Sequence, residues 1–512
     1  MKNITIKMLT LTAVVLVVGG LLSMKNVNKD RTLRVAFPAK LKASTYEPTS
    51  ISMDYEYIFL ENVFSPLVEI SKSGSIEPGV AEKVDWVGDE LRLTIRKGLK
   101  TISGAPITAD DVIFSLKRLL ILSGNTHGNF KDIVCPGVEL KSVEDPCPGI
   151  RQDNGHVYLE AKGRKSFLLP MLSAIDFAII PKSSVDPKTL KITNFSETSG
   201  PYSLSEDDGN GNIVLRLNPN HYFASSEIAD KIVLVPMDTS VMNSSLTALK
   251  ENRIDHLTTV DSTKVSEALR FAANNADFES HVTMKIRSLF LVFTERGQKE
   301  LSAGERRFIG EKMKAVFAKL YENIPGYEQR AEFFPSLGEG GLTVQQQQRL
   351  VEVSTQDMTA PKKHFKLGLI RRSAIEEWAN PIQTALPMAN CYQETNSPEF
   401  KKYENEEDIP HAWLASGDTG FMEDISLISY SLNAGLLGLS KSQRSAWLAD
   451  YMATDDKAVR INKLKELHYK ALSEPAIVPL IASPYAALVR KPWKIELSEL
   501  YANNQLWRIK LH

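Results

Sequence analysis

The sequence is poor in cysteine and histidine, and neither sign of charge is in excess. Three cysteines among 512 residues are too few for a disulfide-rich scaffold or a cysteine-rich metal protein. Lys and Arg total 61 against 62 for Asp and Glu, which argues against binding nucleic acid through a broadly basic surface. With 43% hydrophobic and 24% charged residues, the chain is not disordered. These absences leave a large globular protein with room for two or more domains.

Short catalytic and nucleotide-binding motifs are also missing. The chain contains no G-x-x-x-x-G-K-[ST] loop, no H-E-x-x-H pair and no G-x-S-x-G turn. Its nine histidines are scattered singly, so we expect no metal site. Groups from distant loops can still build an active site. The missing motifs therefore favour a binding protein without catalytic residues, metal or cofactor.

The first 23 residues differ in composition from the rest. Lys2 and Lys7 precede an apolar run, Leu9–Leu22. A basic start followed by an apolar segment of this length is typical of a secretory signal. No clean small-residue cleavage site follows. We therefore predict a signal peptide or N-terminal membrane anchor over residues 1–23, with the remainder periplasmic or otherwise extracytoplasmic.

Two of the cysteines fit that compartment. Cys135 and Cys147 are each followed by proline in a Gly- and Pro-rich stretch. A disulfide between them would close a short loop and restrict the unfolded chain, while two free thiols are the alternative. We expect the third cysteine, Cys391, to be buried.

Hydrophobic periodicity predicts strands and helices that alternate over most of the chain. The expected strands are 32–36, 91–95, 202–204, 213–217, 232–235, 365–370, 410–415, 476–481 and 486–489. The expected helices are 54–70, 110–122, 241–250, 308–321, 345–348, 375–385 and 461–472. Thr108 is positioned to cap the second of these helices. This alternation favours α/β domains with crossover connections, and no domain-length linker separates them.

Several blocks of residues, in a fixed order, carry a family resemblance. The most specific is 91–100 (LRLTIRKGLK) followed by 103–115 (SGAPITADDVIFS). The others are 65–68 (SPLV), 74–82 (GSIEPGVAE), 199–204 (SGPYSL), 218–222 (NPNHY), 248–255 (ALKENRID) and 474–480 (EPAIVPL). Together they resemble the extracytoplasmic solute-binding proteins of family 5, the peptide-, oligopeptide- and nickel-binding components of ABC importers. Glycines at turns and a capped helix explain many of these residues, so the blocks indicate the fold more directly than the ligand.

The resemblance implies a type II periplasmic-binding-protein fold, in which two α/β lobes enclose a ligand cleft and a small domain is inserted. By this resemblance, lobe I takes residues 32–45, 191–275 and 475–512. The inserted subdomain of lobe I takes 46–190, and lobe II takes 276–474. A ligand would bind between the lobes and favour the closed form.

The resemblance also implies ligand-binding residues. In peptide-binding members, an acid in a lobe II block receives the free amino group of the ligand. The matching stretch, 415–424 (ASGDTGFMED), departs from the family pattern; Asp418 is the preferred match and Asp424 the second. A loop acid exposed to solvent is the alternative. The further candidates for the cleft are Tyr46, Asp54, Tyr55, Phe293 and Thr294.

The function implied is that of an extracytoplasmic receptor for peptides or other small solutes. Its expected partner is an ABC permease in the cytoplasmic membrane, and we expect a monomer that binds no nucleic acid. Two alternatives stay open. One is a membrane-tethered sensor or regulatory binding module that kept the fold, and the other is a peptide hydrolase.

Overall fold

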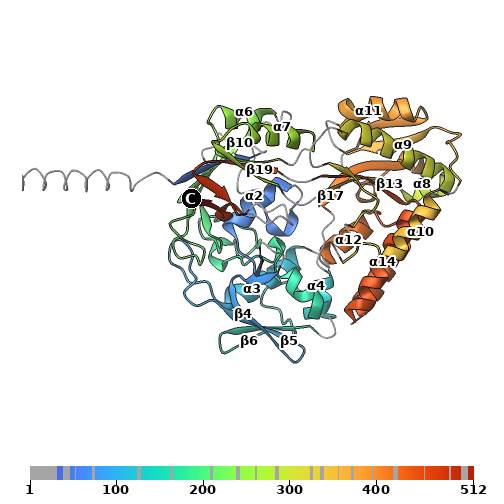
Figure 1. The fold of residues 1–512 in the computed structure, drawn as a ribbon. Helices are drawn as coiled ribbons and strands as arrows, with labels where there is room; N and C mark the ends of the chain where they lie inside the picture. The colour runs from blue at the N-terminus through green and yellow to red at the C-terminus, as the bar shows by residue number, and fades with distance from the viewer. Residues whose placement is uncertain are drawn as a thin grey trace, which may run out of the picture.

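The computed structural model (Figure 1) describes residues 31–37, 46–51, 54–71, 75–123, 128–161, 165–207, 211–237, 243–259, 262–282, 287–322, 327–334, 339–355, 357–370, 374–394, 397–418, 425–454, 456–483, 486–496 and 505–512. Within these ranges the chain forms two large mixed sheets that lie side by side, with a smaller sheet beneath the first. Among the helices so described, none has both the length and the apolar character that crossing a bilayer requires.

Seven strands of the described chain form the first sheet, in the order β12-β19-β11-β1-β10-β9-β8. Their bounds are β1 (Thr32–Phe37), β8 (Tyr202–Asp207), β9 (Ile213–Leu217), β10 (Lys231–Pro236), β11 (His256–Thr259), β12 (Phe278–Val282) and β19 (Ala486–Arg490). Strand β1 is central and runs parallel to both β10 and β11. Helices α6 (Asn243–Lys250) and α7 (Ser262–Ala273) cover the upper face of this sheet in Figure 1.

The second sheet has six described strands in the order β14-β18-β13-β17-β15-β16. Their bounds are β13 (Arg287–Phe293), β14 (Glu328–Gln329), β15 (Phe365–Leu369), β16 (Ala389–Gln393), β17 (Ala412–Asp418) and β18 (Ile477–Ser483). Strand β15 runs parallel to β16 and β17, whereas β13 runs antiparallel to β17 and β18.

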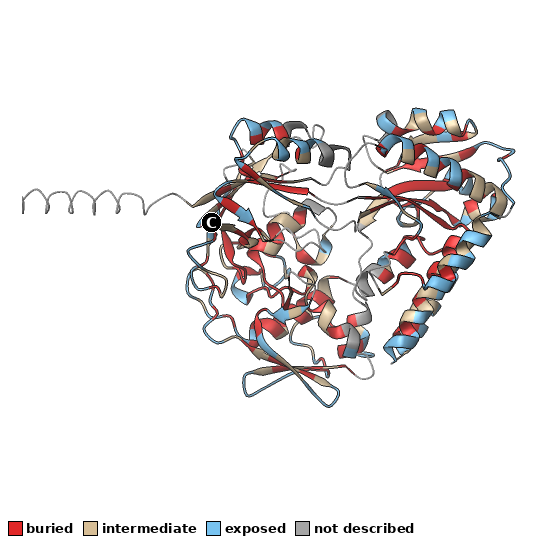
Figure 2. Ribbon diagram, in the orientation of Figure 1, coloured by how far each residue is buried: buried red, intermediate tan, exposed pale blue. Residues whose placement is uncertain are grey.

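Helices cover both faces of the second sheet, which explains why β13 is apolar at nearly every position. Its associated helices are α8 (Glu295–Glu300), α9 (Ala303–Tyr321), α10 (Val344–Ser354), α11 (Ala374–Ala385), α12 (Ile425–Asn433), α13 (Lys441–Ala453) and α14 (Lys457–Ser473). Leu289 and Leu291 join the core beneath α9 and α11, while Phe290 and Val292 join the core that includes α12 and α14. Figure 2 shows the resulting buried band between the two helix layers.

A smaller unit lies beneath the first sheet. It contains α2 (Asp54–Val63), β2 (Val68–Ile70), β3 (Ile76–Pro78), β4 (Ala81–Val87), β5 (Glu90–Ile95), α3 (Ala109–Leu122), α4 (Gly128–Val134), β6 (Ile150–Asp153), β7 (His156–Glu160) and α5 (Lys165–Met171). The order in its four-stranded sheet is β4-β5-β7-β6. Helix α5 contacts α12, and one apolar core runs from this unit into the lower face of the second sheet. Near the C-terminus, β20 (Trp493–Ile495) and β21 (Ile509–Leu511) pair in an antiparallel ribbon, here called the C-terminal ribbon.

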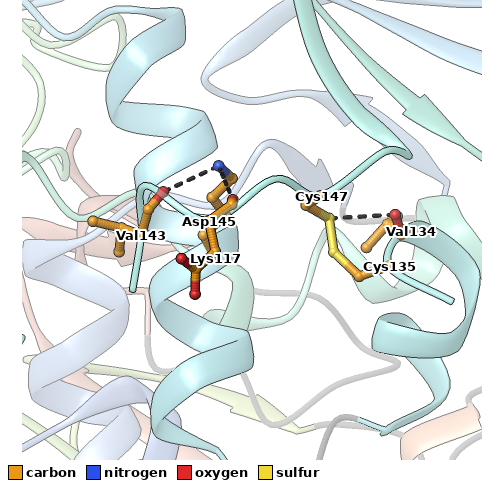
Figure 3. Close-up of a disulfide and its surroundings, with 6 residues drawn as sticks. All are labelled: Lys117, Val134, Cys135, Val143, Asp145 and Cys147. Atoms are coloured by element: carbon orange, nitrogen blue, oxygen red, sulfur yellow. Dashed lines mark hydrogen bonds between the residues drawn. A yellow bond between two sulfur atoms is a disulfide. The ribbon is translucent and has the colours of Figure 1, made fainter. Parts of the chain in front are cut away.

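The structure joins Cys135 and Cys147 by a disulfide within this unit, with Cα atoms 5.1 Å apart. Both residues are buried. Beside the bridge, Lys117 of α3 crosses the enclosed loop, and its Nζ donates to the carbonyl oxygens of Val143 at 3.0 Å and Asp145 at 2.8 Å (Figure 3). The loop is therefore fixed at its ends by the disulfide and in its middle by a lysine.

Two sequence-based expectations differ from the structure. The helix predicted over 54–70 ends at Val63, because Pro66 disfavours helical backbone at the residue before it, and residues 68–70 form β2 instead. The boundaries predicted at 276 and 475 also each fall one strand early. Strand β12 belongs to the first sheet and β18 to the second, because an apolar strand pattern does not reveal which sheet the strand joins.

Candidate ligand-binding site

One edge of the second sheet has the geometry of a binding site. Because β15, β16 and β17 are parallel, their carboxyl ends, at Leu369, Gln393 and Asp418, share this edge. The chain enters the sheet here from β12 at Arg287 and leaves here toward β19 at Ser483. Both connections lead to the first sheet, so the edge faces it (Figure 1). In open α/β sheets, ligands bind outside the carboxyl ends of the strands.

Asp418, the preferred ligand-binding acid, is the last residue of β17 and so lies at this edge. In the antiparallel register it is directly opposite Arg287 of β13. The Arg287 Nη2 atom donates to Ser416 Oγ at 3.4 Å. Asp424, the second choice, lies outside the described residues. The structure thus brings Asp418 to the carboxyl edge together with a cation that the sequence motifs do not indicate.

A buried carboxylate lies just beyond β16 at the same edge. Glu394 is 1% exposed and forms an ion pair with Lys401, while it accepts from the hydroxyls of Tyr392 at 3.2 Å and Tyr403 at 3.1 Å. Burial and the adjacent Glu394 raise the pKa of both tyrosines, so their hydroxyls stay protonated and act as donors. Because three side-chain donors already bind Glu394, its role is to hold the segment after β16 in place, and we do not expect it to bind a solute. Sequence analysis missed this cluster because its members meet only once the sheet edge has formed.

An aromatic pair is exposed near this cluster. The rings of Phe400 and Tyr430, on the segment after β16 and on α12, are 6.0 Å apart, and both side chains are about half exposed. Two adjacent exposed rings form a small apolar patch on the surface. They give the edge an apolar element beside its charged groups.

The other predicted ligand residues are placed elsewhere. Tyr46 is 3% exposed and packs against Phe37 and Phe59 in the core of the first sheet, with ring centroids 6.2 and 5.4 Å away. Phe293 is fully buried, and Thr294 accepts from Gly297 N at 3.1 Å as the N-cap of α8.

Phe293 and Thr294 also lie at the wrong end of the sheet for the predicted role. Because β13 runs antiparallel to β17, Phe293 is opposite Ala412, at the far end from Asp418. Asp54 and Tyr55 begin α2, and their side chains lie outside the described part of the molecule. Strand direction, which local sequence does not encode, is the reason Phe293 and Thr294 do not lie beside Asp418.

The glycines of the matched motifs lie where backbones touch. A Cβ atom at Gly200 would be 2.4 Å from the carbonyl carbon of Val63, and one at Gly79 would be 2.7 Å from the carbonyl oxygen of Pro66. Real Cβ contacts are never this short, so only glycine fits without backbone movement. Gly200 thus joins the small unit to the first sheet, and Gly79 packs within the small unit, so both positions are explained by the fold.

The aspartate of the 248–255 block has a similar structural role. Asp255 is buried and accepts from the backbone N of Arg34 at 3.0 Å, from its Nε at 2.8 Å and from its Nη2 at 2.7 Å. Charge-assisted, bidentate pairs of this kind are among the strongest hydrogen bonds in proteins. Asp255 therefore fixes β1, the central strand of the first sheet, to the turn before β11.

Ser65 of the small unit and His221, in the segment between β9 and β10, form a pair that does not have catalytic geometry. Ser65 Oγ lies 3.2 Å from His221 Nε2, and the backbone N of Phe223 donates to His221 Nδ1 at 3.2 Å. The Nδ1 atom is therefore an acceptor, so the proton resides on Nε2 and points toward Ser65. A base that activates serine needs the opposite tautomer. Burial lowers the pKa of His221 to about 3, and both residues are buried.

A second buried acid lies where the small unit meets the C-terminal ribbon. Glu69 of β2 accepts from the hydroxyl of Tyr222 at 3.4 Å and from Nε2 of Gln505 at 3.3 Å. Arg508 lies close by and donates from Nη2 to the carbonyl oxygen of Ile70 at 2.9 Å. Burial raises the pKa of Glu69 from 4.5 to about 7, and the opposing attraction of Arg508 is smaller.

Glu69 is expected to make stability decrease as the pH rises. Between pH 4.5 and about 7, folded Glu69 holds a proton that the unfolded chain has lost. Its contribution is therefore complete below pH 4.5 and is lost as the pH rises through 7, at up to about 1.4 kcal/mol per pH unit. We expect Glu69→Gln to remove this decrease, as measured by urea unfolding at a series of pH values. If the free energy of unfolding depends on pH in the same way for wild type and Glu69→Gln across this range, the raised pKa of Glu69 is not its cause. Glu82→Gln, at an exposed position of β4, is the matched charge control.

Known proteins resemble this chain in both sequence and fold. Residues 75–300 match the model of the bacterial extracellular solute-binding proteins, family 5 Middle. The periplasmic oligopeptide-binding protein OppA of Salmonella typhimurium is 24% identical over 194 residues, which is 35% of this chain and 35% of that relative. The match thus spans about a third of the curated relative's length. Within the described residues, no group of three or more His, Cys, Asp or Glu could hold a metal ion.

Solved structures share the fold over nearly the whole chain. Haemophilus influenzae OppA in complex with the peptide RPPGFSPFR has a TM-score of 0.70 at 12% identity, over 94% of this chain and 99% of that chain. NikA from Brucella suis in complex with Fe(III)-EDTA has a TM-score of 0.72 at 15% identity, over 94% of this chain and 100% of that chain. The predicted type II periplasmic-binding-protein fold is confirmed. In this fold and in the matched segment, the chain is similar to the extracellular solute-binding proteins of family 5.

Proposed function

We propose that this protein is an extracytoplasmic receptor that binds peptide-like solutes between its lobes and delivers them to an ABC importer. The observation that carries the proposal is the position of Asp418 at the carboxyl edge of the second sheet, facing the first sheet across two chain connections. A carboxylate there can receive the ammonium group of a free peptide terminus. The relative from Haemophilus influenzae, solved with a peptide, has the same fold.

Closure of the two lobes follows from the same topology. The lobes are connected by the segments between β12 and β13 and between β18 and β19. Two short connections permit a hinge motion, and a ligand that contacts both lobes favours the closed form by its extra contacts there. The permease would then recognise the closed, loaded receptor.

We also propose that the protein lies outside the cytoplasm and does not catalyse a reaction. The Cys135–Cys147 disulfide is the kind of bond that persists in an oxidising compartment. The apolar Leu9–Leu22 segment would direct export. The tautomer of His221 argues against hydrolysis by Ser65. We therefore propose a periplasmic, monomeric and non-catalytic receptor.

A panel of short peptides with free termini tests the proposal. We expect at least one di- to pentapeptide to raise the melting temperature of the purified protein, since a ligand that binds only the folded state stabilises it. Asp418→Asn should weaken binding of that peptide by about 10- to 100-fold, because a charged hydrogen bond contributes roughly 1.5–3 kcal/mol. The measurement is isothermal titration calorimetry.

Two controls make the result specific. Asp408→Asn removes the same charge from an exposed position on the second lobe and should leave the dissociation constant within about twofold. Acetylating the peptide's amino group should mimic Asp418→Asn. If no peptide in the panel binds, or if Asp418→Asn binds as well as wild type, the peptide-receptor proposal is wrong.

A further inference from the structure

The amino end of β13 presents a cation beside the proposed ligand-binding acid. Arg287 and Asp418 are directly opposed in an antiparallel pair, although 131 positions separate them in the sequence. Opposed residues in such a pair have Cβ atoms about 4.5–5.5 Å apart, and opposite charges there attract. This juxtaposition depends on the strand register alone.

The Arg287 side chain extends over the face on which the site would lie. Its Nη2 donates to Ser416 Oγ at 3.4 Å. Alternate residues of a strand share a face, so position 418 is on the same face of β17 as Ser416. Arg287 is partly exposed, and Ser483 of β18 lies opposite it on the other side. Arg287 therefore lies between the ends of β17 and β18 at the edge that faces the first sheet, where a solute held at that edge could reach it.

We propose that Arg287 is a specificity-determining residue of this site and selects peptides whose first residue carries a carboxylate. The inference rests on the proposed function. A ligand whose ammonium group binds Asp418 would hold its first side chain beside the opposed Arg287, and a carboxylate on that side chain can pair with the guanidinium. Arg suits this role because its planar donors match a carboxylate in two hydrogen bonds.

The experiment measures dissociation constants of Glu-Ala-Ala, Ala-Ala-Ala and Lys-Ala-Ala by calorimetry at low salt. For wild type we expect Glu-Ala-Ala to bind about tenfold or more tightly than Lys-Ala-Ala, since one charge-matched contact against one like-charge contact is worth at least 1.4 kcal/mol. For Arg287→Gln we expect the two peptides to bind with dissociation constants that differ by less than about twofold. For Arg287→Lys we expect an intermediate ratio, because the charge remains and the paired geometry is lost.

Arg296→Gln is the matched control. Arg296 lies in α8, beyond the opposite end of β13, so this variant removes the same charge far from the edge. Arg296→Gln should keep the wild-type ratio of the two dissociation constants. The effect of Arg287→Gln could then be assigned to a local contact and not to the change in net charge. Thermal unfolding of each variant without peptide checks that the protein is folded.

The outcomes separate the two proposals. If peptides bind and the Glu-to-Lys ratio is the same in wild type and Arg287→Gln, or is close to one in wild type, the role of Arg287 is overturned while the receptor function stands. If none of the three peptides binds the folded wild-type protein, both proposals are overturned for this ligand class. A ratio that collapses only at Arg287 supports the inference.

Discussion

Replacing Arg306 with methionine is expected to lower the free energy of unfolding of the second lobe by about 4 kcal/mol, through loss of a buried donor group. Arg306 of α9 is 7% exposed. Its guanidinium donates to four carbonyl oxygens, those of Pro475 at 3.1 Å, Gln298 at 3.0 Å, Leu301 at 2.6 Å and Glu474 at 2.7 Å. Methionine keeps the apolar stem but leaves these acceptors without their donor.

Two effects oppose each other in this estimate. An unsatisfied buried acceptor costs roughly 1–3 kcal/mol, and four such acceptors are affected. Removing a cation that burial disfavours, as the lowered pKa of Arg306 indicates, recovers part of that cost. The net loss should appear in urea unfolding followed by tryptophan fluorescence. Lys312→Met, on the exposed side of the same helix, should change stability by less than about 0.5 kcal/mol. A loss below about 1 kcal/mol for Arg306→Met would mean that other donors replace the guanidinium.

The role of Arg306 connects stability with the proposed mechanism. Pro475 and Glu474 form the turn between α14 and β18, and β18 is the strand that leaves the lobe at Ser483. Arg306 thus anchors the start of one of the two strands that connect the lobes. Loosening this turn would let β18 shift at the edge where the ligand is proposed to bind.

Local sequence signals predicted the elements that depend on local chemistry. Thr108 caps α3 as expected, and its backbone N donates to Asp111 Oδ2 at 2.9 Å in a capping box. The alternating pattern of 91–95 became β5. Long-range features were not accessible in this way. Phe293 and Thr294 are at the far end of β13 because strand direction is decided by the whole sheet.

The candidate site shows the same division between local and long-range information. The motif resemblance predicted Asp418 as a ligand-binding residue; the structure places it last in β17, and its role in binding stays a prediction. Nothing in the sequence near Arg287 indicates that it lies opposite Asp418, because the register of β13 and β17 joins segments that are distant in the chain. Glu394 and Tyr403 were missed for the same reason. A single sequence thus indicates which residues have binding chemistry, but the sheet determines which of them meet.

Replacing Cys135 and Cys147 together with serine is expected to lower the free energy of unfolding of the small unit by about 3 kcal/mol, because a cross-link closing a loop of this length restricts the unfolded chain by that amount. The separation in sequence is 12 residues. The Lys117 bonds to Val143 and Asp145 should keep the loop in place in the folded variant, so we expect the effect in the unfolded state.

If the disulfide acts on the unfolded state, its removal should also change the m value of urea unfolding. An unfolded chain without the cross-link exposes more surface, so the dependence of stability on urea, the m value, should rise while the midpoint falls. Cys391→Ser is the control for losing a cysteine outside the bridge and should leave the m value unchanged. A lower midpoint with a lower m value would contradict the assignment, because it would mean that the loop already unfolds within the native state. The double variant and Cys391→Ser together therefore show whether the disulfide acts by restricting the unfolded chain or by stabilising the folded state.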